Sequence, residues 1–218
     1  MVTLSEENYL KAVYHLSKQG VEAVSTNAIA EKVGAKASSV TDMIKKIAEK
    51  DLFNYVKYQG VTLTESGQKM AALIVRKHRL WELFLVEKLN FSWDEVHEVA
   101  EQLEHIKSLK LVNELDAFLG FPKQDPHGDP IPDKNGNIKN IEKELLSAVK
   151  TGNTCFCVGV KDSSKAFLSY LNKKEIALGS KFKILSKETY DGSMVLLYNK
   201  AELNISKSVS QNIFVKVN

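Results

Sequence analysis

The chain has 218 residues, of which 44% are hydrophobic, and these values predict a soluble globular protein of one or two domains. No apolar run approaches the ~20 residues that a membrane-spanning helix needs, and residues 1–10 lack a secretory pattern, so we expect a cytoplasmic protein. The formal net charge of +3 divides into +4 for residues 1–79, −7 for residues 80–144 and +6 for residues 145–218. A basic first segment suits a phosphate backbone and an acidic, histidine-bearing middle suits cations, although solvated helix faces would carry the same charges.

The first segment has the pattern of a helix-turn-helix. A helix begins near Thr3, which has capping-box spacing to Glu6, and a second helix within residues 25–33 ends at Gly34. After the turn, Ser38 or a near neighbour is expected to cap a longer helix whose apolar face contains Val40, Ile44 and Ile47. Two helices joined by a glycine turn, followed by two short strands within residues 52–63, predict a winged helix-turn-helix.

The third helix of this segment exposes short polar residues at its start and lysines further along. Such a helix can read base edges first and phosphates later, and the tip of the two strands would form a wing. An ordinary helical hairpin with a solvated face would show the same charges. The candidate DNA contacts are Asn27, Lys36, Ser38, Ser39, Thr41, Asp42, Lys45, Lys46, Lys57 and Tyr58.

The middle segment concentrates groups that bind metals. Ser92 and Glu95 have capping-box spacing and are expected to open a helix with one charged side, formed by His97, Glu101, Glu104 and His105. The preceding helix offers His78 and Glu82, one turn apart. Two imidazoles and two carboxylates on one side suit Mn, Fe or Zn, although charged residues so placed are usually a solvated face.

A proline-rich linker separates this helical part from a strand-rich part. All four prolines (Pro122, Pro126, Pro130 and Pro132) fall between Gly120 and Ile138, where neither a helix nor a central strand can continue. Short alternating runs follow at 155–160, 181–185, 194–198 and 213–217, with one helix at 164–171. Cys155 and Cys157 lie two apart in the first run, so we interpret them as buried hydrophobic residues rather than as a disulfide or thiolate metal site.

The motifs along the chain, taken together, resemble those of the diphtheria toxin repressor and manganese transport regulator family. The motifs that carry the resemblance are Glu7-Asn8-Tyr9-Leu10, Ser38-Ser39-Val40-Thr41, Leu63-Thr64-Glu65-Ser66-Gly67, Arg76-Lys77-His78-Arg79-Leu80, Val96-His97-Glu98, Glu101-Gln102-Leu103-Glu104-His105, Pro126-His127-Gly128 and Pro130-Ile131-Pro132. The resemblance implies a mainly α chain with a β-rich C-terminal part. Its expected domains are a winged helix-turn-helix at 1–72, a helical metal-binding and dimerisation domain with its linker at 73–140, and an SH3-like domain of the ferrous iron transport protein A type at 141–218.

The resemblance also implies three sets of metal ligands. The regulatory set is Asn8, Glu101, Glu104 and His105, and the ancillary set is His78, Glu82 and His97. Longer manganese-type members have a related second site, which here would combine Glu82 with Asp125, His127 and Asp162. For single residues a simpler interpretation stays open, in which Asp125 caps a turn, His127 is solvated and Asp162 caps the helix near Ser164.

Two departures from the family pattern concern the regulatory site. Asn8 stands where iron-type members have Met and manganese-type members have Asp, so its amide would be a weaker ligand. Lys11 replaces a glutamate of short manganese-type members, which argues against a binuclear site. Because Glu101 offers a hard oxygen where iron-type members have Cys, the pattern favours Mn(II) over Fe(II), with Zn(II) or Co(II) possible in vitro.

Two rival functions are a metallohydrolase and a metal-independent winged-helix regulator. His97-Glu98-Val99-Ala100-Glu101 ends in Glu, so the zincin motif HExxH is not intact, and the chain is predicted not to be an enzyme. We therefore expect a homodimeric repressor that binds double-stranded operator DNA when a divalent metal joins Asn8 to the acidic helix. Without metal, repulsion between Glu101 and Glu104 is expected to disfavour the DNA-binding geometry.

Overall fold

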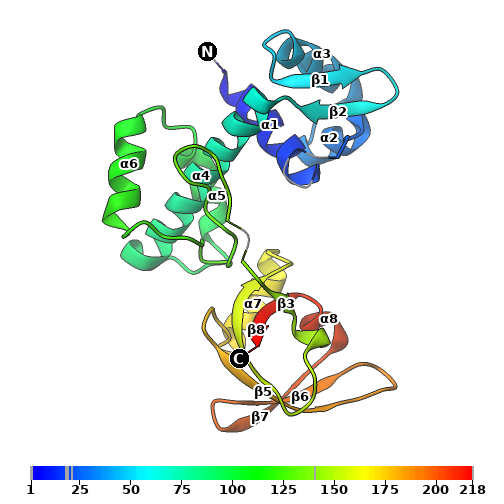
Figure 1. The fold of residues 1–218 in the computed structure, drawn as a ribbon, viewed down its shortest axis with the longest axis vertical. Coiled ribbons are helices and arrows are strands. Elements are labelled where there is room, and N and C mark those ends of the chain that lie inside the picture. Colours follow the sequence, from blue (N-terminus) through cyan, green and yellow to red (C-terminus); the bar gives the residue numbers. More distant parts are fainter. Residues whose placement is uncertain (1, 18–19, 21, 140, 218) are drawn as a thin grey trace. The chain divides into compact units, whose positions relative to one another are not determined.

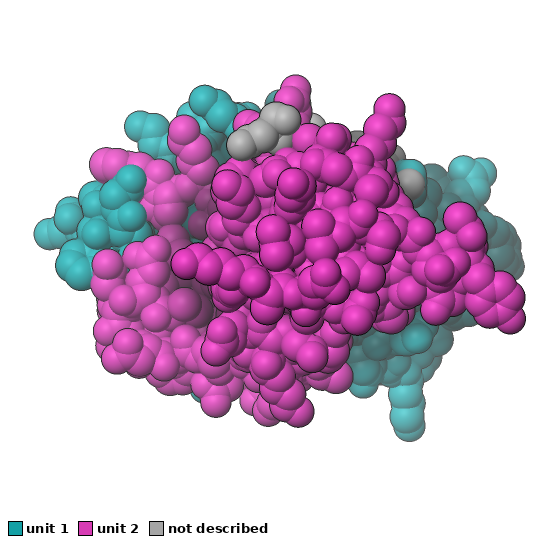
Figure 2. Space-filling model, turned by 90° about the horizontal axis from the view of Figure 1, so that it is seen from below, with its two compact units in different colours: residues 1–81, 100–120, 131–139 teal, residues 82–99, 121–130, 140–218 magenta. Residues whose placement is uncertain are grey.

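The computed structural model describes residues 2–17, 20, 22–139 and 141–217 (Figure 1). These residues form two compact units, which Figure 2 colours separately. Unit 1 contains residues 1–81, 100–120 and 131–139, and unit 2 contains residues 82–99, 121–130 and 140–218. The units are not continuous in sequence. The helix at Glu65–Leu89 begins in unit 1 and ends in unit 2, and the helix at Val96–Leu103 begins in unit 2 and ends in unit 1.

Unit 1 begins with the expected helix-turn-helix, formed by α1 (Leu4–Leu16), α2 (Thr26–Val33) and α3 (Ala37–Ala48). The capping box of Thr3 and Glu6 is present, and Gly34 ends α2 in the left-handed conformation with φ of 65°. The prediction that Ser38 or a near neighbour caps α3 holds only for the neighbour. Helix α3 begins at Ala37, so Ser38 lies inside its first turn. The N-cap is Lys36, which makes no side-chain capping bond.

A two-stranded antiparallel sheet follows α3 and forms the wing. Strand β1 (Phe53–Val56) pairs with β2 (Gly60–Leu63), and the sheet contacts α1 and α3 (Figure 1). Val40, Ile44 and Ile47 of α3 are fully buried, as their spacing predicted, and they pack in one core with residues of α1 and of the sheet. This packing fixes the opposite, polar side of α3 toward solvent.

Three helices follow the wing: α4 (Glu65–Leu89), which runs into the acidic middle segment, and α5 (Val96–Leu103) and α6 (Leu109–Phe118) within it. The predicted capping box at Ser92 is wrong in part: the Ser92 N–H donates to Glu95 Oε2 at 3.2 Å, but the helix begins only at Val96. The helix also ends earlier than expected, because Glu104 and His105 lie in the turn after Leu103. The Glu104 N–H still donates to the Ala100 carbonyl at 2.8 Å, which keeps Glu104 in helical register.

Unit 2 is built on a six-stranded antiparallel sheet with the order β3-β8-β4-β5-β6-β7. Its elements are β3 (Glu144–Leu145), η1 (Leu146–Ala148), β4 (Thr154–Val160), α7 (Lys165–Lys173), β5 (Lys181–Lys187), β6 (Met194–Tyr198), β7 (Ala201–Ile205), α8 (Lys207–Ser210) and β8 (Ile213–Val217). The four predicted runs become β4, β5, β6 and β8. Strand β7 was not predicted, because its sequence Ala-Glu-Leu-Asn-Ile has few β-branched residues.

Cys155 and Cys157 are buried on β4, as predicted, and both are free thiols. Burial raises the pKa of each thiol to about 11, so both are protonated and unreactive at neutral pH. Among the described residues, no helix is both long and apolar enough to cross a bilayer.

The linker docks onto β4 within unit 2. The Val160 N–H donates to the His127 carbonyl at 2.9 Å, and Gln124 Nε2 donates to the Gly128 and Val158 carbonyls at 3.0 and 3.1 Å. Gly128 has φ of 84°, and a Cβ there would lie 2.1 Å from the Val158 carbonyl oxygen. Glycine at position 128 therefore permits both the turn and the close approach to the strand.

A buried carboxylate ties α1 to α3 within unit 1. Glu6 is 0% exposed, and both of its oxygens accept hydrogen bonds from Lys50 Nζ, at 2.7 and 2.8 Å, while Lys46 Nζ lies 3.6 Å away. Burial alone would raise the pKa of Glu6, but the Lys50 ammonium and the Thr3 N–H outweigh burial and lower it to about 2. The ionised carboxylate thus fixes α1 against the last turn of α3.

We predict that Gly128→Ala destabilises unit 2 by about 2 kcal/mol or more, because it adds a steric clash to the strain of a positive φ. Gly152→Ala is the matched control: Gly152 also has a positive φ, of 90°, but no atom lies within 4 Å of its Cβ position. The control should lose only about 1 kcal/mol. Urea unfolding measures both, and equal losses in the two variants would show that the linker does not dock on β4.

We also predict that Glu6→Gln costs about 2 to 4 kcal/mol at pH 7, because it removes the buried negative charge that accepts hydrogen bonds from the Lys50 ammonium and the Thr3 N–H. The pKa of Glu6 is below its ordinary value, so its contribution is fully present above pH 4.5 and is lost as the pH falls toward 2. The difference in unfolding free energy between the wild type and Glu6→Gln should therefore shrink between pH 7 and pH 3. The exposed Glu49, changed to Gln, should differ from wild type by no more than about 0.5 kcal/mol at either pH.

Candidate metal centre and DNA-binding surface

Six polar residues of unit 1 form what we call the α1–α5 cluster. They come from α1, α4, α5 and the turn that follows α5, and they include three of the four residues of the predicted regulatory set. The members are Glu7, Lys11, His78, Glu101, Glu104 and His105.

Glu104 is the centre of this cluster and is 1% exposed. Its Oε2 accepts from Lys11 Nζ at 2.7 Å and lies 2.6 Å from His78 Nδ1. Burial alone would raise the pKa of Glu104, but His78 and the Lys11 ammonium together hold the pKa below its usual range. Glu104 is therefore an ionised, buried carboxylate whose Oε2 has two partners, while its Oε1 lies 4.0 Å from His105 Nε2. His78, which the sequence assigned to the ancillary set, contacts a residue of the regulatory set.

The contacts of α1 differ from those that the sequence suggested. The Asn8 side chain is exposed, whereas Glu7 Oε2 lies 2.6 Å from His105 Nδ1 and Lys11 reaches Glu101 at 3.4 Å. Glu7 and Lys11 are four residues apart, so they share one face of α1. That i, i+4 spacing is a signal in the sequence from which a shared polar face could have been predicted.

The second group of candidate ligands, which we call the linker cluster, lies in unit 2. It consists of Glu82 on α4 with Asp125 and His127 of the linker, and all three are buried. One donor atom from each residue lies within 4.8 Å of the others. This juxtaposition was predicted from the family resemblance, and the linker's docking on β4 is what brings it about.

The linker cluster is held by an ion pair at one ring nitrogen of His127 and a hydrogen bond at the other. Nδ1 lies 3.6 Å from Glu82 Oε2, and Nε2 lies 2.8 Å from the Trp93 carbonyl, with the Trp93 ring stacked at 6.1 Å. Although burial lowers the pKa of His127, the carboxylates of Glu82 and Asp125 raise it to about 9. The cluster thus balances two carboxylates against one imidazolium.

Two further predicted ligands, His97 and Asp162, have simpler surroundings, and Asp125 of the linker cluster also makes turn contacts. His97 is 63% exposed and pairs with Glu82 at 3.3 Å within unit 2. Asp162 accepts a hydrogen bond from the Ser164 N–H at 2.8 Å, in the turn that leads into α7. Asp125 Oδ1 also accepts from the N–H groups of His127 and Asp129. Turn formation therefore accounts for the described contacts of Asp162 and for part of those of Asp125.

The polar side of α3 and the wing carry the candidate DNA-binding residues. Nine of the ten candidate DNA contacts are exposed, and Tyr58 at the wing tip is 92% exposed. Thr41 is half-buried, and its hydroxyl donates to the Ala37 carbonyl at 3.0 Å. Lys46 Nζ lies 3.6 Å from Glu6, whereas Lys45 is exposed on the same helix.

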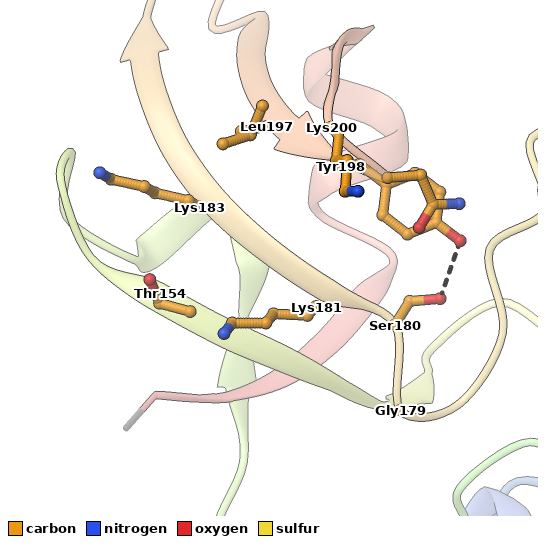
Figure 3. Close-up of a pocket in the computed structure, with 9 residues that line it drawn as sticks. Thr154, Gly179, Ser180, Lys181, Lys183, Leu197, Tyr198 and Lys200 are labelled. Atoms are coloured by element: carbon orange, nitrogen blue, oxygen red, sulfur yellow. Dashed lines mark hydrogen bonds between the residues drawn. The ribbon is translucent and has the colours of Figure 1, made fainter.

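A separate pocket of about 710 Å³ opens on unit 2, between β4, β5 and the turn after β6 (Figure 3). It is lined by Thr154, Gly179, Ser180, Lys181, Lys183, Leu197, Tyr198, Asn199 and Lys200. The Ser180 and Tyr198 hydroxyls are hydrogen-bonded at 3.2 Å, as Figure 3 shows. Three lysines make this pocket unsuitable for a cation, and none of the predicted metal ligands is among the described residues that line it.

The donor chemistry of both clusters fits a divalent metal. Each combines carboxylate oxygens with imidazole nitrogens, a mixture that suits Mn, Fe and Zn. The buried carboxylates of Glu82 and Glu104 are ionisable groups that need a compensating cation, which a metal would supply.

Three family models together match most of the chain. A model for the iron-dependent repressor N-terminal DNA-binding domain matches residues 1–61, and one for the iron-dependent repressor metal-binding and dimerisation domain matches residues 64–133. A FeoA domain model matches residues 145–217. These matches confirm the expected fold class, with a helix-turn-helix start, a helical middle and an SH3-like end.

Relatives and solved structures agree with these models. The iron-dependent repressor IdeR of Mycobacterium bovis is 32% identical over 58% of this chain, but the match spans only 54% of IdeR. The regulator MntR of Oceanobacillus iheyensis is 32% identical over 66% of this chain and 91% of its own length. A manganese-dependent transcriptional repressor solved with manganese is 36% identical, with a TM-score of 0.87 over 98% of this chain and all of that one. The chain therefore belongs to the family of metal-dependent repressors that includes the diphtheria toxin repressor and MntR.

Proposed function

We propose that this chain is a metal-activated transcriptional repressor that binds operator DNA as a homodimer in the cytoplasm. The observation that carries the proposal is the α1–α5 cluster, because it joins the first helix of the DNA-binding part to candidate ligands on the acidic segment. Its family consists of DNA-binding repressors rather than enzymes. The runner-up function is a winged-helix regulator that ignores metal.

Two sets of residues would hold the metal. In unit 1, Glu101, Glu104 and His105 would provide a regulatory site, with a further donor from α1 at Asn8 or Glu7. In unit 2, Glu82, Asp125 and His127 would provide a second site, with Asp162 as a further donor. A bound divalent cation would supply electrostatic cross-linking of carboxylates that otherwise rely on side-chain cations.

Mn(II) is the favoured metal and Fe(II) the alternative. Glu101 offers a carboxylate oxygen rather than a thiolate, and hard oxygen donors suit Mn(II). One structural relative, 36% identical, was solved with manganese, and another, ScaR, was solved with Zn²⁺ and with Cd²⁺. Zn(II) or Co(II) would bind more tightly in vitro by the Irving–Williams order, so availability in the cell would decide the physiological ion.

The contacts of α1 suggest how ligand rearrangement would reach the DNA. Glu6 holds the end of α3, Glu7 meets His105, and Lys11 meets Glu104. A change at the last two contacts would therefore move α1 and α3 together. Helix α3 would be the recognition helix that enters the major groove, and the two α3 helices of a dimer would have to lie about 34 Å apart to enter successive major grooves.

A homodimer is supported by apolar residues on the surface of α6. Leu111 and Phe118 are 42% and 65% exposed, and they lie seven residues apart, on one face of the helix. Exposed apolar side chains on one helix face are typical of a surface that a partner helix covers. Dimerisation would bury this face and set the spacing of the recognition helices.

We predict that Glu104→Gln and His105→Ala each lower metal-stimulated operator binding at least about tenfold, because each removes a ligand of the regulatory site. Mobility-shift titrations with Mn(II), Fe(II) and Zn(II) against a chelator measure the effect, and sedimentation confirms that the variants stay dimeric. Operator affinity that is equal with chelator and with metal in the wild type would establish the metal-independent alternative instead.

His127→Ala provides the matched contrast, because it removes a buried imidazole from the other cluster. It should keep metal-stimulated DNA binding but lose one bound ion in calorimetry. Glu98→Ala, at an exposed position of α5 that is not a predicted ligand, should change neither. If His127→Ala and His105→Ala behave identically, the two clusters do not form separate sites.

We predict that Lys45→Ala weakens binding to all DNA sequences and lowers the slope of log affinity against log salt by about one per protomer. Lys45 is a cleaner test than Lys46, because Lys46 also pairs with Glu6 inside the protein. Ser39→Ala should instead reduce the preference for operator over random DNA, because short polar residues early in α3 would reach base edges. Lys110→Ala, exposed on α6, is the control and should leave the salt slope unchanged.

A further inference from the structure

The ammonium group of Lys11 lies beside two carboxylates that the proposed regulatory site would use as metal ligands, and beside the His78 imidazole. Lys11 Nζ is 2.7 Å from Glu104 Oε2, 3.4 Å from Glu101 Oε1 and 3.4 Å from His78 Nδ1. These three side chains come from α4, α5 and the turn after α5, all within unit 1. One lysine on α1 therefore gathers donors from three separate segments.

The Lys11 side chain is held in this position rather than extended into solvent. It is 12% exposed, and its partner Glu104 is 1% exposed. A buried carboxylate loses its hydration, so the ammonium at 2.7 Å supplies much of the compensation that water would otherwise give. This contact differs from a surface ion pair, whose net contribution is small.

From this geometry we infer that Lys11 is a built-in competitor for the regulatory metal: its ammonium fills the place of the cation, and metal must displace it from Glu104. The inference rests on the proposed function and deepens it. The same oxygen of Glu104 cannot serve a divalent ion and keep a bonded ammonium without strong repulsion between the two cations. The metal-free site is consequently a closed, charge-balanced arrangement rather than an open group of repelling carboxylates.

Displacement has a thermodynamic consequence that can be measured. The Lys11–Glu104 contact stabilises the metal-free chain but is absent from the metal-bound one, so it subtracts from metal affinity. Removing the ammonium destabilises only the metal-free state. The metal affinity of the variant should therefore rise by the factor that corresponds to the stability lost from the metal-free state.

The test compares four forms of the full-length chain: wild type, Lys11→Leu, Lys11→Arg and Lys77→Leu. Leucine removes the charge and offers no ligand atom, and arginine keeps the charge. Lys77 is the matched control, because it is also poorly exposed and pairs with Glu7 at 4.0 Å, yet no bond from it to Glu104 is described. The Lys77→Leu variant loses a positive charge near the cluster but keeps the Lys11 ammonium beside Glu104, Glu101 and His78.

Calorimetry with Mn(II) should give Lys11→Leu at least about tenfold tighter binding at the regulatory site, equivalent to about 1.4 kcal/mol. Lys77→Leu should change affinity much less, and Lys11→Arg should bind no more tightly than wild type. Thermal unfolding in chelator should show a lower Tm for Lys11→Leu, by about 3 to 6 °C, whereas the Tm of the metal-loaded forms should agree. The Mn(II) concentration for half-maximal operator binding should fall in proportion.

Unchanged Mn(II) affinity in Lys11→Leu, or an equal gain in Lys77→Leu, would overturn the inference, because the effect would then be absent or only long-range. An equal loss of Tm in the chelated and loaded forms would also overturn it, since Lys11 would then be an ordinary structural ion pair. These outcomes differ from a failure of the proposed function, in which neither wild type nor Lys11→Leu would bind metal through Glu104 and His105.

Discussion

A carboxylate that is buried must find a cation or several hydrogen bonds, and this requirement organises both units of the chain. Glu6, Glu82 and Glu104 are each 3% exposed or less. Glu6 is compensated by Lys50, Glu104 by Lys11 and His78, and Glu82 by contacts with His97 and His127. Leaving such a group without its partner costs several kcal/mol, so each glutamate fixes the segments that supply its partners.

Periodicity and turn chemistry predicted the elements of the fold well. Val40, Ile44 and Ile47 recur at helical spacing and are buried, and Gly34 ends α2 as its position suggested. Capping residues were less informative, because Ser92 makes part of a capping box four residues before the helix begins. A local hydrogen bond can form without a helix following at once, so the motif fixes a turn but not a helix start. Strand β7 was missed because its pairing with β6 depends on tertiary contacts rather than on β propensity.

The candidate site was predictable as a set of residues but not as a set of contacts. Glu104, His105, Asp125 and His127 could be named from motifs, and the structure brings Asp125 and His127 to Glu82. The sequence could not show that His78 contacts Glu104, because that requires the packing of α4 against the end of α5. Nor could it show that Glu7 rather than Asn8 faces His105, because a helix rotation of 100° separates these neighbours. Contacts made across the core depend on such rotations, which local patterns leave undefined.

Helix α1 is the element through which these contacts combine. It has 13 residues and presents charged side chains to two directions: Glu6 toward α3, and Glu7 and Lys11 toward the acidic segment. A helix this short moves as a rigid body, because its backbone hydrogen bonds resist bending over so few turns. Exchange of partners at Glu104 and His105 would therefore reach Lys50 and α3 without any change inside α1. The ion pair between buried Glu6 and Lys50 makes the connection between α1 and α3 stiff. Because Lys50 compensates the Glu6 charge, the buried carboxylate is compatible with the stability of this small DNA-binding fold.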